Sequence, residues 1–276
     1  MAFFSRYSPY IVAIFALILL NQKVLARQSD MFCDNRENHC TFVLLNGKTN
    51  KLTISNKQRA QVRLSPFSTF KIPNSLIALE AGIVDKIDTP ISYSAKIYPA
   101  QNWWPKSWYE TEHTLEHAFK HSVVPIYRTI ATKIGKKEMQ NKLNIFNYGN
   151  RDISSGIDSF WLDKSITISA IEQVQFLRKL HQREFDIKDE SYQKLANIMK
   201  AESTQSYQLF AKTGGGQVAA NKALGWYVGY TVYNKVPFYF AFNMNDKTFN
   251  NLKTKRITIA KQSLVQYGAL PESALH

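Results

Sequence analysis

The chain has 276 residues and a formal net charge of +14, with 35 lysines and arginines against 21 aspartates and glutamates. A chain of this length can form one large domain with a substantial hydrophobic core. Its basic residues are dispersed, and no helix-turn-helix, zinc-finger or RNA-recognition signature accompanies them, which argues against a nucleic-acid-binding protein. We interpret the charge as a basic, soluble surface that can also attract anionic substrates.

Residues 1–26 have the three parts of an export signal. Arg6 supplies positive charge, an apolar run of ten residues extends from Ile11 to Leu20, and Val24-Leu25-Ala26 offers small residues for cleavage. The run is shorter than the about 20 residues that span a bilayer, although an uncleaved anchor is the alternative. We predict an exported, periplasmic domain, residues 27–276, without a stable membrane anchor. Its net charge falls from +14 to +12 because Arg6 and Lys23 leave with the signal.

The chain has two cysteines, Cys33 and Cys40, which lie seven positions apart in the exported part. In an oxidising compartment such a pair is expected to close a small disulfide loop. A metal site would need more soft ligands nearby than His39 alone, so we predict no metal.

Short apolar runs joined by turns predict three strands in the first part of the chain: residues 41–46, 51–55 and 58–64. The segment from Pro66 to Ile72 predicts a tight turn and a first helical turn, because the following Pro73 cannot donate a hydrogen bond to a carbonyl four residues back. A regular helix is predicted from Pro73 to Ala81, with Gly82 as its stop signal.

Residues 84–112 show no clear period and are rich in aromatic residues. The aromatic residues are Trp103, Trp104, Trp108 and Tyr109. We predict a structured loop whose aromatic side chains either line a cleft or pack in the core. Five helices follow, at about 114–120, 125–134, 136–146, 167–182 and 189–201. Thr114 and Asp189 are the expected caps of the first and the last of these helices.

The pattern changes to strands at Tyr207, and strands are predicted at 207–212, 223–233 and 236–245, followed by a helix at 253–266. Asn234-Lys235 is expected to join the last two strands in a tight hairpin. The fold class is therefore predicted to be α+β, a central antiparallel β-sheet built from both halves of the chain and flanked by helices. An inserted helical lobe is expected at about 93–202, with the helix that follows Ser68 at the seam.

Ser68 and Lys71 are three residues apart at the predicted start of that helix, so their side chains share one face. A serine is a poor nucleophile until a neighbouring base takes its proton, and Lys71 is the nearest candidate. The flanking Phe67, Phe70 and Ile72 are apolar, which disfavours a charged ammonium. A Ser-x-x-Lys pair alone is weak evidence, since most such pairs are a solvated serine and an exposed lysine.

Three further motifs follow in order: Ser122-Val123-Val124, Tyr148-Gly149-Asn150 and Lys212-Thr213-Gly214. Together with Ser68-x-x-Lys71 they resemble the penicillin-recognising serine acyltransferases, and most of all the class D β-lactamases, the oxacillinase family. Further likeness lies in Pro73-Asn74, residues 160–162, 225–229 and 240–244, and the pair Cys33 and Cys40. The resemblance covers residues 31–270 and implies a β-lactamase/transpeptidase-like fold.

The resemblance implies that Ser68 is the nucleophile that opens a β-lactam ring. It also implies that Lys71 carries a carbamate formed from CO2 or bicarbonate, an anionic oxygen base, with no other cofactor. Phe70, Val124 and Trp161 would line the apolar pocket that keeps the amine neutral. The Trp161 N–H would donate to the carbamate, with plain core packing as the alternative for this residue.

Ser122 would relay a proton to the leaving nitrogen, supported by Lys212. The backbone N–H groups of Ser68 and Gly215 would form the oxyanion hole. Thr213, beside Gly214 in the same motif, and Arg256 would hold the substrate carboxylate.

Tyr148, Gly149 and Asn150 are expected to shape the site and to take no chemical part. Gly215 and Gly216 depart from the family, since many relatives have a bulkier residue after the Lys-Thr-Gly motif. We expect this glycine-rich strand end to be flexible and to leave one wall of the cleft open.

The predicted function is hydrolysis of β-lactam antibiotics, which would confer resistance. The alternatives are a β-lactam sensor domain that stays acylated, a longer and anchored transpeptidase, and a basic nucleic-acid binder that would leave the four motifs unexplained. Small β-lactam molecules are the expected partners, and the protein is expected to be a monomer or a homodimer.

Overall fold

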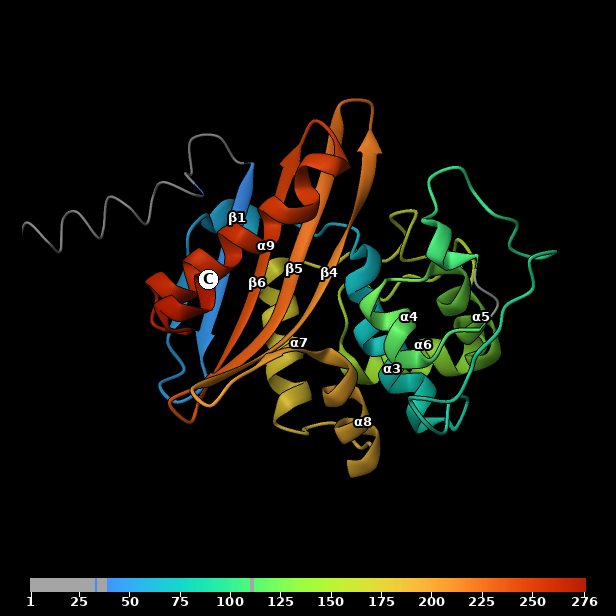
Figure 1. Ribbon diagram of the computed structural model, residues 1–276, viewed down its shortest axis with the longest axis horizontal. Helices are drawn as coiled ribbons and strands as arrows, with labels where there is room; N and C mark the ends of the chain where they lie inside the picture. The colour runs from blue at the N-terminus through green and yellow to red at the C-terminus, as the bar shows by residue number, and fades with distance from the viewer. Residues whose placement is uncertain (1–32, 34–38, 110–111) are drawn as a thin grey trace, which may run out of the picture.

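A computed structural model describes Cys33, residues 39–109 and residues 112–276. In this part of the chain, six strands form one antiparallel sheet in the order β2-β1-β6-β5-β4-β3 (Figure 1). The strands are β1 (Cys40–Asn46), β2 (Leu52–Ile54), β3 (Lys200–Ser203), β4 (Tyr207–Ala219), β5 (Lys222–Tyr233) and β6 (Val236–Asp246). Strands from both ends of the chain pair with each other, because β1 lies between β2 and β6. The predicted α+β fold with a central antiparallel sheet is confirmed.

Both faces of the sheet are buried, and the residues of β6 show how the chain achieves this. Phe238, Phe240 and Phe242 pack with one hydrophobic cluster, whereas Tyr239 and Ala241 pack with another on the opposite face. Successive side chains of a strand point to opposite faces, so a continuous apolar run can fill two cores at once.

Helix α9 (Phe249–Gln266) packs on β5 and β6 on one face, and α7 (Ala170–His181) packs on β6 and β1. In Figure 1, α9 lies in front of the sheet and α7 behind it, while α3 to α6 gather beside β4. The remaining helices are α2 (Lys57–Ala60), α3 (Lys71–Glu80), α4 (Leu115–Lys120), α5 (Val124–Ile134), α6 (Lys136–Phe146) and α8 (Asp189–Met199), with 3-10 turns η1 (Phe67–Phe70), η2 (Lys106–Trp108) and η3 (Glu272–Leu275). Helix α3 therefore lies at the boundary between the sheet and the group of helices α4 to α6.

Several local predictions are confirmed by the backbone. The Thr114 side chain accepts a hydrogen bond from the His117 N–H at the start of α4. Asn234 and Lys235 both have positive φ, 50° and 61°, as a type I′ hairpin turn requires. Gly82 has φ +67°, which suits a helix stop.

Other predictions are wrong. Residues 58–64 do not form a strand, because Asn56 caps the short helix α2 by accepting from the Arg59 N–H, and Leu64 makes only an isolated bridge to Ile168. Helix α7 begins later than predicted, since Ser169 and Glu172 form a capping box that fixes its start.

The helix predicted at 189–201 differs from the structure at both ends. Asp189 is the first residue of α8 and not its cap, which is Lys188 without a side-chain bond. Lys200 and Ala201 leave the helix to begin β3, a strand the sequence analysis did not predict.

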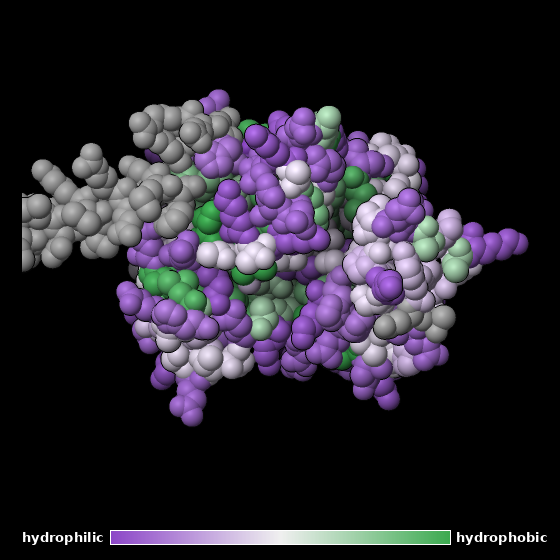
Figure 2. Space-filling view, turned by 45° about the horizontal axis from the view of Figure 1, so that its top comes forward, coloured by the Kyte–Doolittle hydropathy of each residue, from purple (hydrophilic) through white to green (hydrophobic). Residues whose placement is uncertain are grey.

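Cys33 and Cys40 form the predicted disulfide. The predicted export signal, residues 1–26, lies outside the described residues. Within those that are described, no helix is long and apolar enough to cross a membrane. The face shown in Figure 2 is largely covered by hydrophilic residues, with hydrophobic ones in separate patches.

Candidate active site

Ser68 and Lys71 meet where the 3-10 turn η1 becomes the helix α3. The distance between Lys71 Nζ and Ser68 Oγ is 3.1 Å. The Lys71 side chain is 1% exposed, and this burial lowers the pKa of its amine from 10.5 to about 7. A serine hydroxyl therefore touches an amine that is neutral for much of the time at neutral pH.

Aromatic rings surround this pair. Lys71 Nζ lies 4.8 Å from the centroid of the Tyr127 ring, and the Tyr127 hydroxyl is hydrogen-bonded to Ser75 at 2.8 Å. The Phe70 ring stacks on Trp161 with centroids 5.5 Å apart and an interplanar angle of 15°. Burial beside the Tyr127 ring keeps water from the amine, and this burial is the cause of its lowered pKa.

Ser122 and Lys212 form a second hydroxyl and amine pair, joined across 90 residues of sequence. Lys212 Nζ donates to Ser122 Oγ at 2.6 Å and to the Thr213 carbonyl oxygen at 3.0 Å. Ser122 has φ +57° between α4 and α5, a conformation that few side chains adopt without a surrounding constraint. Lys212 is buried in β4, and burial, then the charges of Lys71 and Arg256, lower its pKa.

Arg256 reaches the cleft from α9. Its Nη1 donates to the Gly214 carbonyl oxygen at 2.8 Å, and the guanidinium lies 5.1 Å from the centroid of the Phe249 ring. Burial lowers the pKa of Arg256 to about 10, so it remains a cation at neutral pH. Thr213 lines the cleft beside it.

A cleft of about 750 Å³ connects these groups. Its lining includes Ser68, Ser122, Val124, Thr213, Gly214, Gly215 and Arg256, all of them predicted site residues. Lys71 and Lys212 lie buried behind the two serines. Among the described residues, none that lines the cleft is an aspartate or a glutamate, whereas Lys120, Lys253 and Arg256 are basic. The cleft suits an anionic ligand, and its described lining offers no carboxylate that could serve as a general base.

The expected opening at Gly215 and Gly216 is wrong. β4 continues without interruption through both glycines to Ala219. A Cβ atom at Gly215 would lie 2.7 Å from the Phe249 ring, and one at Gly216 would lie 2.8 Å from the Phe67 ring. Two aromatic rings from other elements therefore occupy the space of the missing side chains and close the wall.

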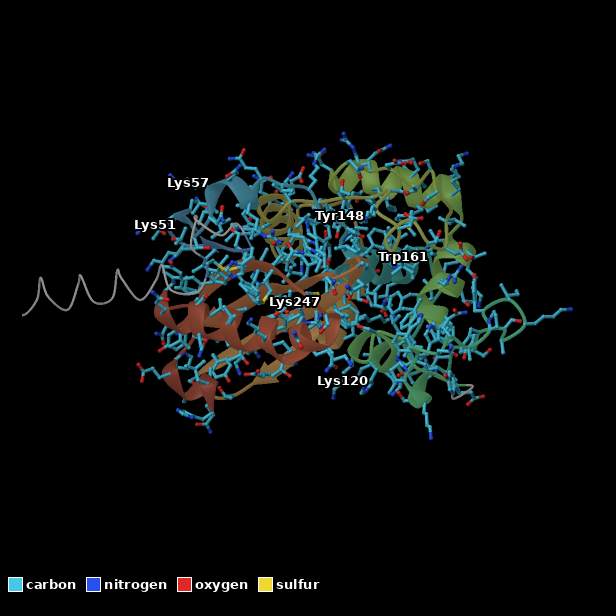
Figure 3. The ribbon with its side chains drawn as sticks, turned by 90° about the horizontal axis from the view of Figure 1, so that it is seen from above. Lys51, Lys57, Lys120, Tyr148, Trp161 and Lys247 are labelled. Atoms are coloured by element: carbon cyan, nitrogen blue, oxygen red, sulfur yellow. A yellow bond between two sulfur atoms is a disulfide. The ribbon has the colours of Figure 1, made fainter. Side chains whose placement is uncertain are left out.

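Trp161 is not part of the cleft lining but lies fully buried, on the helical side of the sheet in Figure 3. Within the described part of the chain, its Nε1 has no hydrogen-bond acceptor. Neither amide atom of Asn74, which follows Lys71 by three residues on the same face of α3, has a partner among the described residues: Nδ2 lacks an acceptor and Oδ1 lacks a donor. Buried polar atoms are rarely left unpaired, so the N–H groups of Trp161 and Asn74 indicate an acceptor that is not one of the described side chains.

The Tyr148-Gly149-Asn150 motif supports the loop that carries Trp161. Asn150 donates to the Ser165 carbonyl oxygen at 2.7 Å and accepts from the Thr167 N–H at 2.9 Å. Tyr148 is fully buried, and its ring contacts Phe70 edge to face. None of the three residues lines the cleft.

Phe67, Leu162 and Phe249 also line the cleft, and their contributions were not predicted from the sequence. Trp103 and Trp108 line it as well, and Trp108 and Trp104 also pack in the hydrophobic core, so both alternatives left open for these aromatic residues occur. The sequence does contain a signal for two of them. Gly215 and Gly216 leave space in β4 that large side chains can fill, and Phe67 and Phe249 are such side chains. No cluster of three or more metal-ligating side chains occurs in the described segments.

The chain is similar to known proteins in sequence and in fold. Residues 40–264 match the family described as the penicillin binding protein transpeptidase domain. Beta-lactamase OXA-48 of Klebsiella pneumoniae is 37% identical over 229 residues, which cover 83% of each chain. The structure of FUS-1 (OXA-85), a class D beta-lactamase from Fusobacterium nucleatum subsp. polymorphum, matches with a TM-score of 0.77 at 34% identity and covers 84% of this chain and 93% of that chain. Regulatory protein BlaR1 of Bacillus licheniformis is 31% identical over 203 residues, which are 74% of this chain but 33% of BlaR1.

Proposed function

The chain belongs to the class D β-lactamases, hydrolases that open β-lactam rings, and on that premise we propose that the ring acylates Ser68 and that a base at Lys71 then helps water to release the product. The observation that carries the proposal is the 3.1 Å contact between Ser68 Oγ and the buried Lys71 Nζ. A hydroxyl needs an adjacent base to become a nucleophile, and an exposed lysine would be protonated at neutral pH. Burial lowers the pKa of Lys71, so that its amine can be neutral and can accept a proton.

Acylation would begin when Ser68 Oγ attacks the β-lactam carbonyl carbon and its proton passes to the base at Lys71. The ring C–N bond then breaks, and the nitrogen needs a proton. Ser122 is suited to donate it, because Lys212 lies 2.6 Å from its hydroxyl and can stabilise the negative charge that develops there.

The negative charge on the carbonyl oxygen would be stabilised by two backbone N–H groups, those of Ser68 and Gly215. The two segments that carry them meet closely, since a Cβ atom at Gly214 would lie 2.9 Å from the Thr69 nitrogen. A glycine at this position lets β4 approach the nucleophile's turn backbone to backbone.

Thr213 and Arg256 would hold the substrate carboxylate. Arg256 Nη1 already donates to Gly214 and its Nε is buried, so Nη2 would be the nitrogen that donates to the ligand. The basic lining and the absence of acidic side chains from the described part of the cleft would favour an anionic substrate.

A neutral amine reacts with CO2 to give a carbamate, and on Lys71 this group would supply an anionic oxygen base for both halves of the reaction. The residues present fit such a group: the Trp161 Nε1 and the Asn74 Nδ2 are buried N–H donors that lack an acceptor among the described residues. None of the described residues that line the cleft has a carboxylate that could act as this base. These observations support carbamylation of Lys71, with the carbamate as the oxygen base of the site.

Replacing Trp161 by phenylalanine is expected to weaken carbamylation. The Phe70 stack would be kept, but the N–H would be lost, and a hydrogen bond to a charged group contributes about 2 kcal/mol, or roughly 30-fold in affinity for CO2. The measurement is the bicarbonate concentration that restores half-maximal hydrolysis, which should rise by about that factor.

Trp226 offers a matched control, because it is equally buried but its Nε1 already donates to the Ser65 carbonyl oxygen at 2.9 Å. Trp226→Phe should lower stability and leave the bicarbonate dependence unchanged. Equal bicarbonate dependence in Trp161→Phe and the unaltered protein would remove the role proposed for the Trp161 N–H.

The function itself is tested by mixing the purified protein with an excess of a chromogenic cephalosporin. We expect continuous turnover, with kcat on the order of 1 to 1000 s⁻¹. A burst of one equivalent followed by no further reaction, with a stable acyl adduct in the intact mass, would contradict hydrolysis. That result would favour a sensor like BlaR1, part of which this chain resembles.

We further propose that the enzyme is exported and protects the cell from β-lactam antibiotics. The Cys33–Cys40 disulfide supports an oxidising compartment.

A further inference from the structure

Phe67 lies directly before the nucleophile and contributes its ring to the cleft wall. Its backbone has φ +48°, which is rare for a residue with a bulky side chain. The turn is held by Thr69, whose N–H and hydroxyl both donate to the Pro66 carbonyl oxygen, at 3.1 and 2.8 Å. Gln173 in turn donates to the Thr69 hydroxyl at 2.9 Å. The position of the Phe67 ring is therefore fixed by the same contacts that fix Ser68.

Gly216 faces this ring from β4. Alternate residues of a strand point to the same side, so Gly214 and Gly216 both face the turn of Ser68, beside which β4 runs in Figure 1. A Cβ atom at Gly214 would lie 2.7 Å from the Pro66 carbonyl oxygen, and one at Gly216 would lie 2.8 Å from Phe67 Cε1. The Phe67 ring thus fills the place that a side chain at position 216 would take.

The direction of the substrate follows from the proposed function, on which this inference rests. In a β-lactam, the ring nitrogen and the carbon that bears the acylamino group flank the carbonyl carbon, so the groups attached to these two atoms leave the ring on opposite sides of the carbonyl. With the carbonyl oxygen at the Gly215 N–H and the nitrogen toward Ser122 and Lys212, the acylamino group extends along β4 away from Lys212. It therefore reaches Gly216 and Gln217, which line the cleft together with Phe67.

We propose that Phe67 and Gly216 form one specificity-determining pair, in which the Phe67 ring is the apolar wall against which the acyl substituent lies. Gly216 permits this wall, because any larger residue would push the ring toward Ser68 or into the space of the substituent. The pair affects the part of the substrate beyond the β-lactam core and leaves recognition of the core to the catalytic residues.

The test compares benzylpenicillin with 6-aminopenicillanic acid, which has the same core and carboxylate but no acyl substituent. Phe67→Ala is expected to lower kcat/KM for benzylpenicillin about tenfold and to change that for 6-aminopenicillanic acid less than about twofold. Gly216→Ser should lower kcat/KM for benzylpenicillin at least about tenfold, and adding Phe67→Ala to it should restore part of the loss. Thermal unfolding of each variant checks that it is folded.

Phe249→Ala is the matched control, because this ring packs against Gly215 on the other face of β4 and beside Arg256. It should affect the two substrates equally, since both carry the carboxylate. Equal losses for both substrates in Phe67→Ala, or additive effects in the double variant, would overturn the inference and leave Phe67 as a support of the nucleophile only. If the unaltered protein hydrolyses neither compound, the proposed function fails instead.

Discussion

Replacement of Ser68 by alanine is expected to lower kcat/KM for a chromogenic cephalosporin by about 10⁴-fold or more, because no covalent acyl enzyme can form. The variant should fold normally, since the Ser68 side chain makes a single hydrogen bond to the described residues, the 3.1 Å bond with Lys71 Nζ. Intact mass after incubation with a slowly hydrolysed β-lactam is the second readout. The unaltered protein should gain the mass of the ring-opened compound and Ser68→Ala should gain none.

Ser122→Ala separates the nucleophile from the proton relay. It removes the hydroxyl bonded to Lys212 but leaves Ser68 and Lys71 in contact. We expect a loss of about 10²- to 10⁴-fold in rate, with the acyl adduct still formed on Ser68. An adduct on Ser68→Ala, or none on Ser122→Ala, would place the nucleophile elsewhere.

Replacement of Lys71 by methionine should abolish turnover, since the site then lacks its base. The expected loss in kcat is about 10³-fold or more, and bicarbonate should not restore activity. Methionine keeps the length of the side chain and is apolar, so it should fit the buried position without a cavity. The variant is therefore expected to be inactive and at least as stable as the unaltered protein.

The difference in stability between Lys71→Met and the unaltered protein should depend on pH, because the pKa of Lys71 is lowered in the fold. The pKa of Lys71 is about 7 in the folded protein against a usual 10.5, so the folded state binds fewer protons than the unfolded state between these values. Stability of the unaltered protein should consequently rise from about pH 7 to about pH 10 in buffer free of CO2. The stability advantage of Lys71→Met should be largest below about pH 7 and should shrink as the pH rises.

Activity should follow the same titration, because protonation of Lys71 removes both the base and the amine that reacts with CO2. We expect kcat/KM to fall as the pH drops through about 7. A stability difference between Lys71→Met and the unaltered protein that does not vary with pH would mean that the amine is protonated in the fold, and the proposed base would be lost.

The strands and helices that the sequence predicted well are those with a strong local cause. Helix α6 matches its predicted range because Gly135 precedes it and its apolar residues recur at helical spacing. The strand predicted at 58–64 is wrong because the alternating apolar Val62 and Leu64 suggest a strand, whereas the Asn56 cap starts a helical turn. β3 was missed because its residues, Lys-Ala-Glu-Ser, have little β propensity and pair only in the context of β4.

The contacts of the site also divide into those that local spacing predicts and those that it does not. The Ser68 and Lys71 contact follows from their spacing alone, because one helical turn joins them. The contact of Ser122 with Lys212 spans 90 residues, and only the resemblance to a family could predict it. Phe67 and Gly216 are even farther apart in sequence, and no local pattern shows that a ring from one would replace a side chain at the other.

The most direct test of the account is the ¹³C NMR spectrum of the protein equilibrated with ¹³C-labelled bicarbonate at about pH 8, above the pKa of Lys71. We predict a protein-bound carbonyl resonance that is absent from Lys71→Met and disappears reversibly on acidification. Identical spectra for Lys71→Met and the unaltered protein would contradict the claim that a neutral, buried amine beside Ser68 becomes the catalytic base.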